Sequence, residues 1–288
     1  MPPSGVVIVK VGGAAITAKD EIESLDDANL DSIVDLVRRA AKESGIGLIL
    51  VHGAGSFGHH HARQSGISGA ALDSPERCKG FASTRLSVQT LNLIVVRRLV
   101  DAGIDAVALS PFSAGGWARS DDDDDSALDA SAFRSLLDAG MVPCIHGDAI
   151  LTAAAPGERI KILSGDEIVQ RLASSLASSV VGCVFITNTF GIYSAPPECE
   201  GAQPVPEIVP GGAAHLKFDV SKTDVTGGMA GKLASALKIA RGGVRVLITK
   251  VASPDAARAV VSFDAALNDP HWRGTRIHDP DASVSALK

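Results

Sequence analysis

Residues 6–13 read VVIVKVGG, and this stretch gives the clearest indication of the fold. The apolar, β-branched residues at its start are typical of a strand that is covered on both faces of a sheet. The glycines at its end, Gly12 and Gly13, let the backbone turn sharply and present N–H groups to an anion. Lys10 adds a positive charge beside them. The stretch predicts a central strand that ends in an anion-binding turn, although a plain turn with a surface lysine would have the same sequence.

Short apolar runs alternate with longer helical patterns along the rest of the chain. The runs expected to be strands lie at residues 6–11, 46–52, 104–109, 141–146, 181–187 and 244–250. The segments expected to be helices lie near residues 29–43, 75–101, 127–138, 165–178 and 228–241. This alternation predicts an α/β fold with a mainly parallel central sheet wrapped by helices. Ligands of such sheets bind beyond the carboxyl ends of the strands, so the loops that leave the strands are the candidates for a site.

The composition restricts the class of protein. With 288 residues, 45% of them apolar, the chain can form one large α/β domain or two closely joined lobes. The formal net charge of -6 argues against a general nucleic-acid-binding surface. No run approaches the roughly 18 apolar residues of a membrane span, and the N-terminus lacks a basic signal region. We therefore expect a soluble, cytoplasmic protein with no nucleic-acid or membrane partner.

The sequence contains no convincing metal site. Four separated cysteines form no C-x-x-C pair, and we expect them to be reduced thiols; they are Cys78, Cys144, Cys183 and Cys199. The run His59–His61 would point in different directions from a helix start, so solvated His60 and His61 are favoured over metal ligation. The aspartates at 121–125 repel one another and predict a solvated loop rather than a lid. Residues 195–213, rich in Pro and Gly, predict a hairpin or a meandering loop.

The second strand leads into residues 52–59, HGAGSFGH, which contain a formal G-x-G-x-x-G pattern. A dinucleotide site would also need a second strand that ends in an acidic residue about 20 positions further on. Asp73 has that spacing, but residues 62–72 contain no strand pattern. A glycine-rich anion cradle fits better, with His59 at its edge to donate a hydrogen bond to a phosphate oxygen.

Three later loops complete the pattern. Gly147 follows the strand at 141–146 and permits close approach of the backbone to a ligand. Asp166 opens a helix, where it is either a capping carboxylate or a group that holds two lysines in position. Paired glycines precede a helix that carries Lys232 in its first turns, which is an arrangement suited to anions. No Walker A motif occurs in the chain, so a nucleotide site must be built from several separate loops.

With these loops in order, the chain resembles the amino acid kinase superfamily and, within it, the isopentenyl phosphate kinases. The similarity covers nearly the whole chain and includes KVGGAAIT, HGAGSFGH, SPFSAGGW at residues 110–117, IHGDAIL, LSGDEIV and DVTGGMAGK. The resemblance implies an open αβα sandwich with an acceptor lobe near residues 1–178 and an ATP lobe near residues 179–288. It also implies a homodimer and an ATP- and Mg²⁺-dependent reaction that converts isopentenyl phosphate to isopentenyl diphosphate.

The resemblance also assigns roles to single residues. Lys10 and Lys232 would neutralise the phosphates of ATP, and Lys19 would reach the transferring group, although an exposed loop lysine is the simpler interpretation of Lys19. Asp166 would organise the lysines, and His59 would hold the acceptor phosphate. The residues assigned to ATP are Lys10, Gly12, Gly13, Gly55, Gly228 and Lys232. Those assigned to the acceptor are Ala54, Gly55, His59 and Gly147.

The chain departs from the family pattern in two places. Ala54 stands where relatives usually have a glycine, which is acceptable if its backbone angles suit a residue with a side chain. Residues 187–193 lack both aspartates of a common T-D-V-D-G-V-Y pattern, which leaves the nucleotide contacts there open. Candidates for the wall of an apolar acceptor pocket, with core packing as the alternative for most of them, are Phe81, Leu86, Leu91 and Ile94.

Other functions remain open from sequence alone. Fosfomycin kinase shares the fold and also phosphorylates a phosphorus oxyacid. A non-catalytic nucleotide-binding or storage protein is a second alternative, but Lys10 and Lys232 are both present. An NAD-dependent oxidoreductase rests only on the formal glycine pattern.

Overall fold

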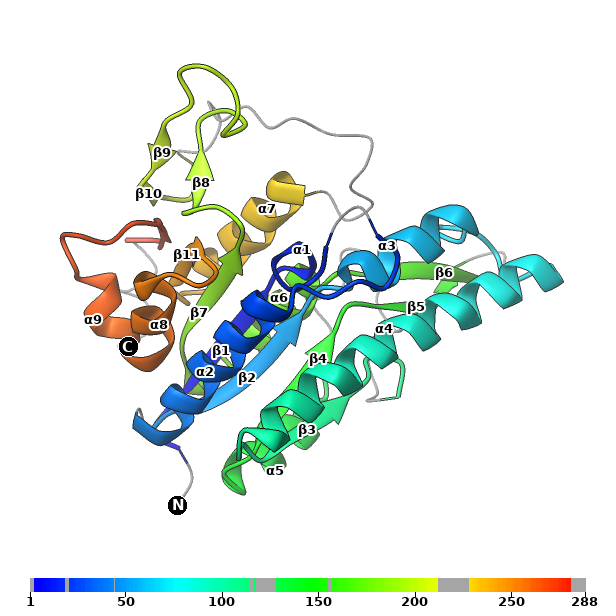
Figure 1. The fold of residues 1–288 in the computed structure, drawn as a ribbon, viewed down its shortest axis with the longest axis horizontal. Coiled ribbons are helices and arrows are strands. Elements are labelled where there is room, and N and C mark those ends of the chain that lie inside the picture. The colour runs from blue at the N-terminus through cyan, green and yellow to red at the C-terminus, as the bar shows by residue number, and fades with distance from the viewer. Residues whose placement is uncertain are drawn as a thin grey trace.

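Strand β1 (Val6–Val11) lies inside an eight-stranded sheet in the computed structural model (Figure 1). The strand order is β10-β12-β11-β7-β1-β2-β4-β3. Neighbouring strands from β11 to β3 are parallel, whereas β12 is antiparallel to β11. The structure describes residues 3–18, 21–43, 45–113, 117, 128–154, 157–211 and 228–280.

The other strands of this sheet are β2 (Gly47–His52), β3 (Ala106–Leu109), β4 (Val142–His146), β7 (Val180–Thr187), β10 (Glu207–Ile208), β11 (Val246–Lys250) and β12 (Thr275–Ile277). Two antiparallel pairs lie outside it, β5 (Asp148–Ala154) with β6 (Gly157–Leu163) and β8 (Ile192–Tyr193) with β9 (Pro204–Val205). The helices are α1 (Gly13–Ile16), α2 (Asp27–Glu43), α3 (Gly55–Gln64), α4 (Pro75–Asp101), α5 (Ser131–Asp138), α6 (Gly165–Ser175), the short 3₁₀ turn η1 (Ala177–Ser179), α7 (Gly228–Arg241), α8 (Pro254–Val261) and α9 (Phe263–Leu267).

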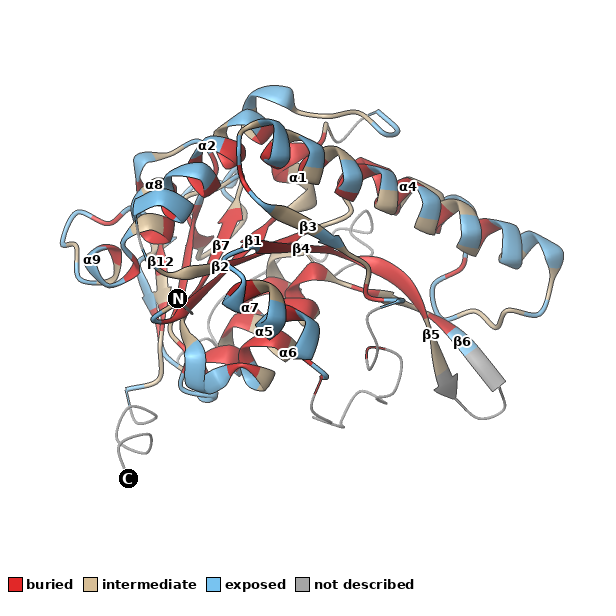
Figure 2. Cartoon of the chain, turned by 90° about the horizontal axis from the view of Figure 1, so that it is seen from below, coloured by how far each residue is buried: buried red, intermediate tan, exposed pale blue. Residues whose placement is uncertain are grey.

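Alternate side chains of β1 pack into two different hydrophobic cores, one on each face of the sheet. Val7 and Val9 pack in a cluster with residues of α2, α4 and α8, whereas Val6 and Ile8 pack with residues of α5, α6 and α7. Figure 2 shows these helix layers on opposite faces of the sheet. Because successive side chains of a strand point to opposite faces, Lys10 follows Val6 and Ile8 toward α6 and α7. This placement confirms the predicted three-layer αβα architecture.

A third, smaller core lies beyond the sheet, where the β5–β6 hairpin meets α3 and α4. Ala62 of α3, Ala149 of β5 and Ile160 of β6 are buried together with Ile67. The hairpin extends from the carboxyl end of β4 and runs beside the long helix α4 (Figure 1). It forms one wall of the region beyond the central strands.

All six strands predicted from the sequence are present in the central sheet, with boundaries that differ by two residues at most. The five predicted helices are present as α2, α4, α5, α6 and α7. The hairpin predicted within residues 195–213 is confirmed in part, since β9 pairs with β8. The β5–β6 hairpin and helices α8 and α9 were not predicted. The aspartates at 121–125 lie outside the described residues.

The four cysteines are free thiols, as predicted, with Cys144 and Cys183 buried and Cys78 and Cys199 exposed. Over the described part of the chain, no helix is both long enough and apolar enough to cross a bilayer.

The turns after β1 and β2 touch each other backbone to backbone. A Cβ atom built on Gly13 would lie 2.6 Å from the Cα of Gly55, and one built on Gly53 would lie 2.6 Å from the nitrogen of Gly13. Gly55 also has a φ of 52°, which side chains disfavour. Thr17 joins the two turns, because its Oγ1 donates to Gly13 O at 3.0 Å and accepts from the N–H of Ser56 at 3.0 Å. These glycines therefore bring two loops closer together than residues with side chains allow.

Gly13→Ala should destabilise the protein by about 2 kcal/mol or more, because the added methyl group forces the two turns apart. Gly12→Ala is the matched control. Gly12 has a φ of -59°, and a Cβ there would meet Ile186 O at 3.5 Å, an ordinary contact. Denaturant unfolding of both variants measures the difference. Equal stabilities for the two variants would contradict the close contact between the turns.

Candidate active site

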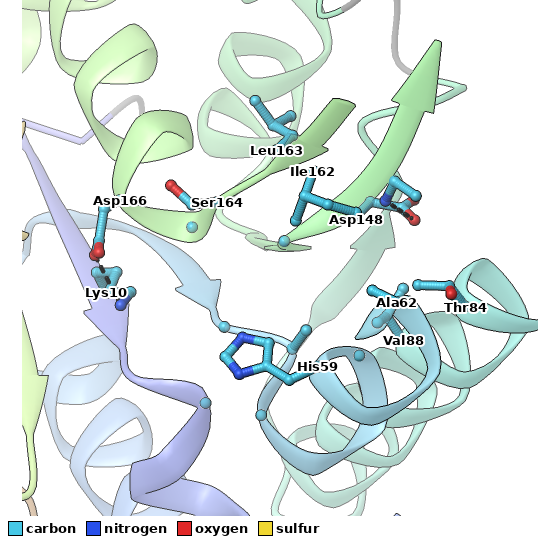
Figure 3. A pocket seen from close by; sticks show the side chains of 18 residues that line it. Lys10, His59, Ala62, Thr84, Val88, Asp148, Ile162, Leu163, Ser164 and Asp166 are labelled. Atoms are coloured by element: carbon cyan, nitrogen blue, oxygen red, sulfur yellow. Dashed lines mark hydrogen bonds and ion pairs between the residues drawn. The ribbon is translucent and has the colours of Figure 1, made fainter. Parts of the chain in front are cut away.

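A cavity opens at the carboxyl ends of β1, β2 and β4, between the first turns of α3 and α6 (Figure 3). One side of it carries charge and exposed backbone, and the other side is apolar. The residues of the charged and backbone side include Lys10, Gly13, Gly53, Ala54, Gly55, His59, Gly147, Ser164, Gly165 and Asp166. This is the edge of the sheet at which the sequence predicts a site.

Asp166 binds two lysines from different elements. Its Oδ1 lies 2.7 Å from Nζ of Lys10 and 3.4 Å from Nζ of Lys232. Lys10 comes from β1 and Lys232 from α7, while Asp166 lies in the first turn of α6, where Ser164 Oγ caps the helix by accepting from the Glu167 N–H. All three side chains are less than a tenth exposed. Of the two interpretations that the sequence left open for Asp166, the contacts agree with the carboxylate that holds two lysines.

The charges of this cluster depend on one another. Burial by itself would raise the pKa of Asp166, but the charges of Lys10 and Lys232 outweigh burial and lower that pKa to about 2. Burial and, to a smaller extent, the charge of Lys10 lower the pKa of Lys232 to about 8, against the attraction of Asp166. Near neutral pH the cluster therefore holds one negative and two positive charges. The excess positive charge at the cavity favours an anion.

Backbone groups extend the anion site across the cavity. The N–H of Gly147 donates to His52 O at 3.0 Å, which joins the loop after β4 to the loop after β2. Gly147 lies so close to Gly165 that a Cβ on it would be 3.4 Å from the Gly165 nitrogen. The first N–H groups of a helix have no partner within the helix, and α3 and α6 both begin at this cavity. Backbone donors at the starts of α3 and α6 thus face one region, which the loop after β4 also lines.

Ala54 fits the cradle despite its methyl group. Its φ of -73° and ψ of -26° lie in the right-handed helical region, which any residue adopts. The methyl group occupies space that is kept free by a glycine one turn later, since a Cβ on Gly58 would overlap it. The departure from the three-glycine family pattern is therefore accommodated locally.

His59 lies on α3 and points its ring into the cavity, between Lys10 and Val88 (Figure 3). Its position in the second turn follows from the tight turn at Gly55, which starts the helix at the cavity edge. The ring N–H groups of histidine are hydrogen-bond donors suited to a phosphate oxygen. His59 therefore lies in the same cavity as the Lys10–Asp166 pair, although it comes from α3 and the pair comes from β1 and α6.

The remaining wall of the cavity is apolar. Ala62, Val88 and Ile162 line it together with Ala149 and Leu163, from α3, α4 and the β5–β6 hairpin. None of the four residues considered from the sequence is among the lining residues. Leu91 is core, Leu86 is 68% exposed, and Phe81 and Ile94 pack partly buried against other clusters.

The predicted site residues fall into four groups. Those that line the cavity are Lys10, Gly13, Ala54, Gly55, His59, Gly147 and Asp166. Lys232 reaches the cluster through Asp166, and Gly228 is the first residue of the helix that carries Lys232. Gly12 lies behind the turn, where its N–H donates to Ile186 O at 2.9 Å. Lys19 lies outside the described residues.

Sequence reasoning missed the partner of Asp148 and the histidines beneath the cradle. Asp148 is a buried residue of the cavity wall that pairs with Arg85 of α4. Burial raises the pKa of Asp148, an effect that Arg85 opposes. His52 and His146 stack with ring centroids 5.8 Å apart, and burial lowers the pKa of each to about 4, so both rings are neutral near pH 7.

A metal cage and a dinucleotide site both lack support. Within the described ranges, no group of three His, Cys, Asp or Glu side chains is placed to hold a metal ion. His61 pairs instead with Glu23, with Nε2 and Oε1 3.0 Å apart. The strand that follows β2 in the chain is β3, which pairs with β4 rather than β2 and begins far beyond Asp73. The formal glycine pattern is therefore not part of a dinucleotide-binding unit.

The loop after β7 contacts the β1 turn without the aspartates of the family pattern. Nδ2 of Asn188 donates to Ala14 O at 2.9 Å, so this loop is tied to α1. The ring of Phe190 lies beneath two cations, 5.3 Å from Nζ of Lys250 and 4.9 Å from Cζ of Arg273. An amide and an aromatic ring thus occupy the positions where the family pattern has carboxylates.

Comparison with known proteins agrees with this fold and site. Residues 5–250 match the amino acid kinase family, and the chain belongs to that family. Within it, the chain is 36% identical to the isopentenyl phosphate kinase of Arabidopsis thaliana, over 94% of each chain. It is 33% identical to the isopentenyl phosphate kinase of Methanothermobacter thermautotrophicus, over 94% of this chain and 98% of the relative.

Solved structures extend the similarity. An isopentenyl phosphate kinase known from X-ray structures is 30% identical, with a TM-score of 0.74 over 94% of this chain and 100% of that chain. The fold is also similar to that of carbamate kinase from Giardia lamblia, with a TM-score of 0.65 at 15% identity, over 97% of this chain and 100% of that chain.

The pKa of Lys232 predicts how kinase activity depends on pH. Since the protonated form of Lys232 decreases as pH rises through about 8, kcat/KM should fall above that pH. Asp166→Asn removes the negative charge that supports protonated Lys232, so the fall should move to lower pH. The measurement is the pH profile of kcat/KM for both proteins.

Glu167→Gln is the control for this profile. Glu167 lies beside Asp166 but pairs with Lys161 and Arg171, so its removal should leave the alkaline limb in place. If Asp166→Asn and Glu167→Gln had the same limb as the wild type, Lys232 would not be the titrating group.

Proposed function

We propose that this chain transfers the γ-phosphoryl group of ATP to isopentenyl phosphate, giving isopentenyl diphosphate and ADP. The observation that carries the proposal is the convergence of Lys10, Asp166 and His59 on one cavity that continues into an apolar wall. A phosphate monoester with a short hydrocarbon tail matches both ends of this cavity. The similarity to isopentenyl phosphate kinases over nearly the whole chain supports the same acceptor.

The reaction requires positioning and charge neutralisation more than proton transfer. An oxygen of the acceptor phosphate attacks the γ-phosphorus, the bond from that phosphorus to the β–γ bridging oxygen breaks, and ADP leaves with the electron pair. The acceptor phosphate is already a nucleophile at neutral pH, so no strong general base is needed. Lys10 and Lys232 stabilise negative charge on the transferring group and on ADP, and His59 holds the acceptor phosphate in line.

The two substrates are assigned to different halves of the chain. We assign the acceptor to the half near residues 1–178, which contributes His59, Gly147 and the apolar wall. We assign ATP to the half near residues 179–288, which contributes Lys232 and Gly228. Lys10 and Asp166 come from the first half, and Asp166 pairs with Lys10 and also with Lys232 of the second half. We infer that this carboxylate marks the boundary at which the two phosphates meet.

Mg²⁺ is implied by the family resemblance, but the described residues provide no carboxylate cage for it. Asp166 is occupied by two lysines, and Asp148 is occupied by Arg85. We therefore propose that Mg²⁺ arrives bound to the phosphates of ATP, where it would neutralise charge.

A panel of acceptors tests the function. With isopentenyl phosphate, dimethylallyl phosphate and fosfomycin as acceptors, isopentenyl phosphate should give the highest kcat/KM. His59→Ala should raise KM for the acceptor about tenfold to a hundredfold, the range for losing a hydrogen bond to a charged group. His60→Ala, one residue along α3 and outside the cavity lining, should leave KM unchanged.

The other outcomes identify the alternatives. A preference for fosfomycin would assign the chain to that class of kinase, and ATP binding without ADP release in the presence of any acceptor would favour a non-catalytic nucleotide-binding protein. A folded His59→Ala protein with near-normal turnover and acceptor affinity would remove His59 from the site.

We also propose that the protein is a cytoplasmic homodimer. Free cysteines are in keeping with a reducing compartment. The dimer is supported by α4, which exposes apolar side chains seven residues apart: Leu86 is 68% exposed, Leu93 62% and Val100 51%. Two antiparallel copies of α4 related by a twofold axis would place Leu93 against its own copy and Leu86 against Val100.

Leu93→Glu should convert the dimer to a monomer, because two carboxylates would meet at the twofold axis. Ile22→Glu replaces another exposed apolar residue, 58% exposed and outside α4, and should leave the dimer intact. Size-exclusion chromatography with light scattering gives the mass of each protein. A monomeric wild type, or a dimeric Leu93→Glu protein, would contradict this interface.

A further inference from the structure

Two fully buried histidines lie directly behind the loops that form the phosphate cradle. His52 is the last residue of β2 and His146 the last residue of β4, and the two are partners in the parallel pairing of these strands. Their side chains lie on the side of the sheet that α4 covers. Neither histidine is among the described residues that line the cavity, whereas the residues that follow them, Gly53 and Gly147, both line it. The rings therefore lie behind the cradle rather than in it.

The two rings differ in the contacts of their nitrogens. Nδ1 of His146 lies 3.0 Å from the carbonyl oxygen of Gly147, and Nδ1 of His52 lies 3.1 Å from that of Gly53. Nε2 of His52 also faces an acceptor, Oδ1 of Asn92 at 3.0 Å, so two acceptors compete for the one N–H of a neutral His52. Nε2 of His146 has no hydrogen-bond partner within the described ranges. Because a carbonyl oxygen can only accept, the ring hydrogen of His146 lies on Nδ1 and is donated to Gly147.

The unpaired Nε2 of His146 is a cost that an apolar ring would avoid. A buried polar atom without a partner loses its hydrogen bonds to water and gains none in return. Phenylalanine could stack on His52 and fill a similar space without burying such an atom. Phenylalanine has no N–H group, however, so it could not donate to the carbonyl of Gly147. That hydrogen bond is what a histidine contributes at this position.

Gly147 is held at both of its peptide groups. Its N–H donates to the carbonyl of His52 at 3.0 Å, and its own carbonyl accepts from the ring of His146. A Cβ atom built on Gly147 would lie 3.4 Å from the nitrogen of Gly165 and 3.8 Å from the nitrogen of Ala54. Gly147 thus lies beside the backbone nitrogens at the starts of α6 and α3, which are the donors of the cradle.

The carbonyl of Gly147 would be free to turn without the ring of His146. A glycine allows a wide range of ψ, so the peptide group that follows Gly147 can rotate at low cost. The carbonyl points to a ring that lies behind the cavity lining, and half a turn would direct it the opposite way, toward the cavity. An unpaired carbonyl oxygen carries partial negative charge and would repel a phosphate there. The hydrogen bond from His146 opposes this rotation.

We propose that His146 is a positioning residue of the acceptor site, whose Nδ1–H keeps the carbonyl of Gly147 turned away from the acceptor phosphate. This inference rests on the proposed function and adds to it a residue that acts on the substrate only through Gly147. It also gives a role to the histidine of the IHGDAIL segment.

His146→Phe tests this role, because it keeps a buried ring and removes the donor. KM for isopentenyl phosphate should rise about tenfold, as expected for the loss of one hydrogen bond, while KM for ATP should change less than about twofold. The variant loses the bond to Gly147 but no longer buries an unpaired nitrogen, so its Tm should stay close to that of the wild type. Steady-state kinetics with each substrate varied and thermal unfolding give these values.

His146→Asn is the matched rescue. The amide nitrogen of asparagine is as many bonds from the backbone as Nδ1 of histidine, so it can donate to the carbonyl of Gly147. The smaller side chain leaves a cavity and should lower Tm, yet KM for isopentenyl phosphate should stay within about threefold of the wild type.

Thr249→Val is the control for removal of a buried polar atom. Thr249 lies on β11, is fully buried, and has an Oγ1 without a hydrogen-bond partner in the part of the chain that the structure describes. Its replacement should leave KM for isopentenyl phosphate equal to that of the wild type.

The two variants of His146 separate positioning from stability, because the more stable variant should bind the acceptor less well. A KM for isopentenyl phosphate within about twofold of the wild type in folded His146→Phe, or a KM that follows Tm in both variants, would overturn the proposal. If neither variant folds, ¹⁵N NMR of the ring in the wild type decides: the bond to Gly147 requires a hydrogen on Nδ1, and a hydrogen on Nε2 alone would refute it. A wild type that does not phosphorylate isopentenyl phosphate would contradict the proposed function, which is a distinct result.

Discussion

A single buried carboxylate, that of Asp166, is the interaction on which the site depends. It holds Lys10 of β1 and Lys232 of α7, so three elements distant in sequence meet at one point. Buried charges persist only when they are paired, and one carboxylate cannot fully neutralise two ammonium groups. The cluster is left with an excess of positive charge at the edge of the cavity. Under the proposed function, phosphate groups of the substrates would complete that balance.

The close contact of the glycine turns adds a second constraint. Gly13, Gly53 and Gly55 let the loops after β1 and β2 meet backbone to backbone, so that the N-terminus of α3 and His59 lie beside Lys10. This chain has no Walker A loop, and its proposed phosphate site is instead built from several short turns on one edge of the sheet. Each glycine turn by itself is weak evidence for a phosphate site. Because the turns follow neighbouring parallel strands, they lie together at the same edge of the sheet.

The sheet and the charged side of the cavity could be predicted because both follow from local patterns. Alternate residues of a strand share one face of the sheet, so the position of Lys10 in an apolar strand decides which face its side chain lies on. The glycines after β1 and β2 indicate turns at one edge of the sheet. Arg85 could not be predicted in the same way, since 63 residues separate it from Asp148 and nothing local selects it among the arginines. The β5–β6 hairpin and the apolar wall were missed for a related reason. Ala62, Val88 and Ile162 are ordinary core-forming residues, and only the packing of α3, α4 and the hairpin turns them toward a cavity.

In the proposed reaction the two phosphates meet directly in one cavity, with no covalent intermediate on the protein. The most direct test uses ATP made chiral at the γ-phosphorus and determines the configuration of the terminal phosphorus in the isopentenyl diphosphate formed. A single in-line transfer between substrates held by Lys10, His59 and Lys232 predicts inversion. Net retention would require two displacements, by way of a phosphorylated protein group, and would contradict direct transfer between the substrates.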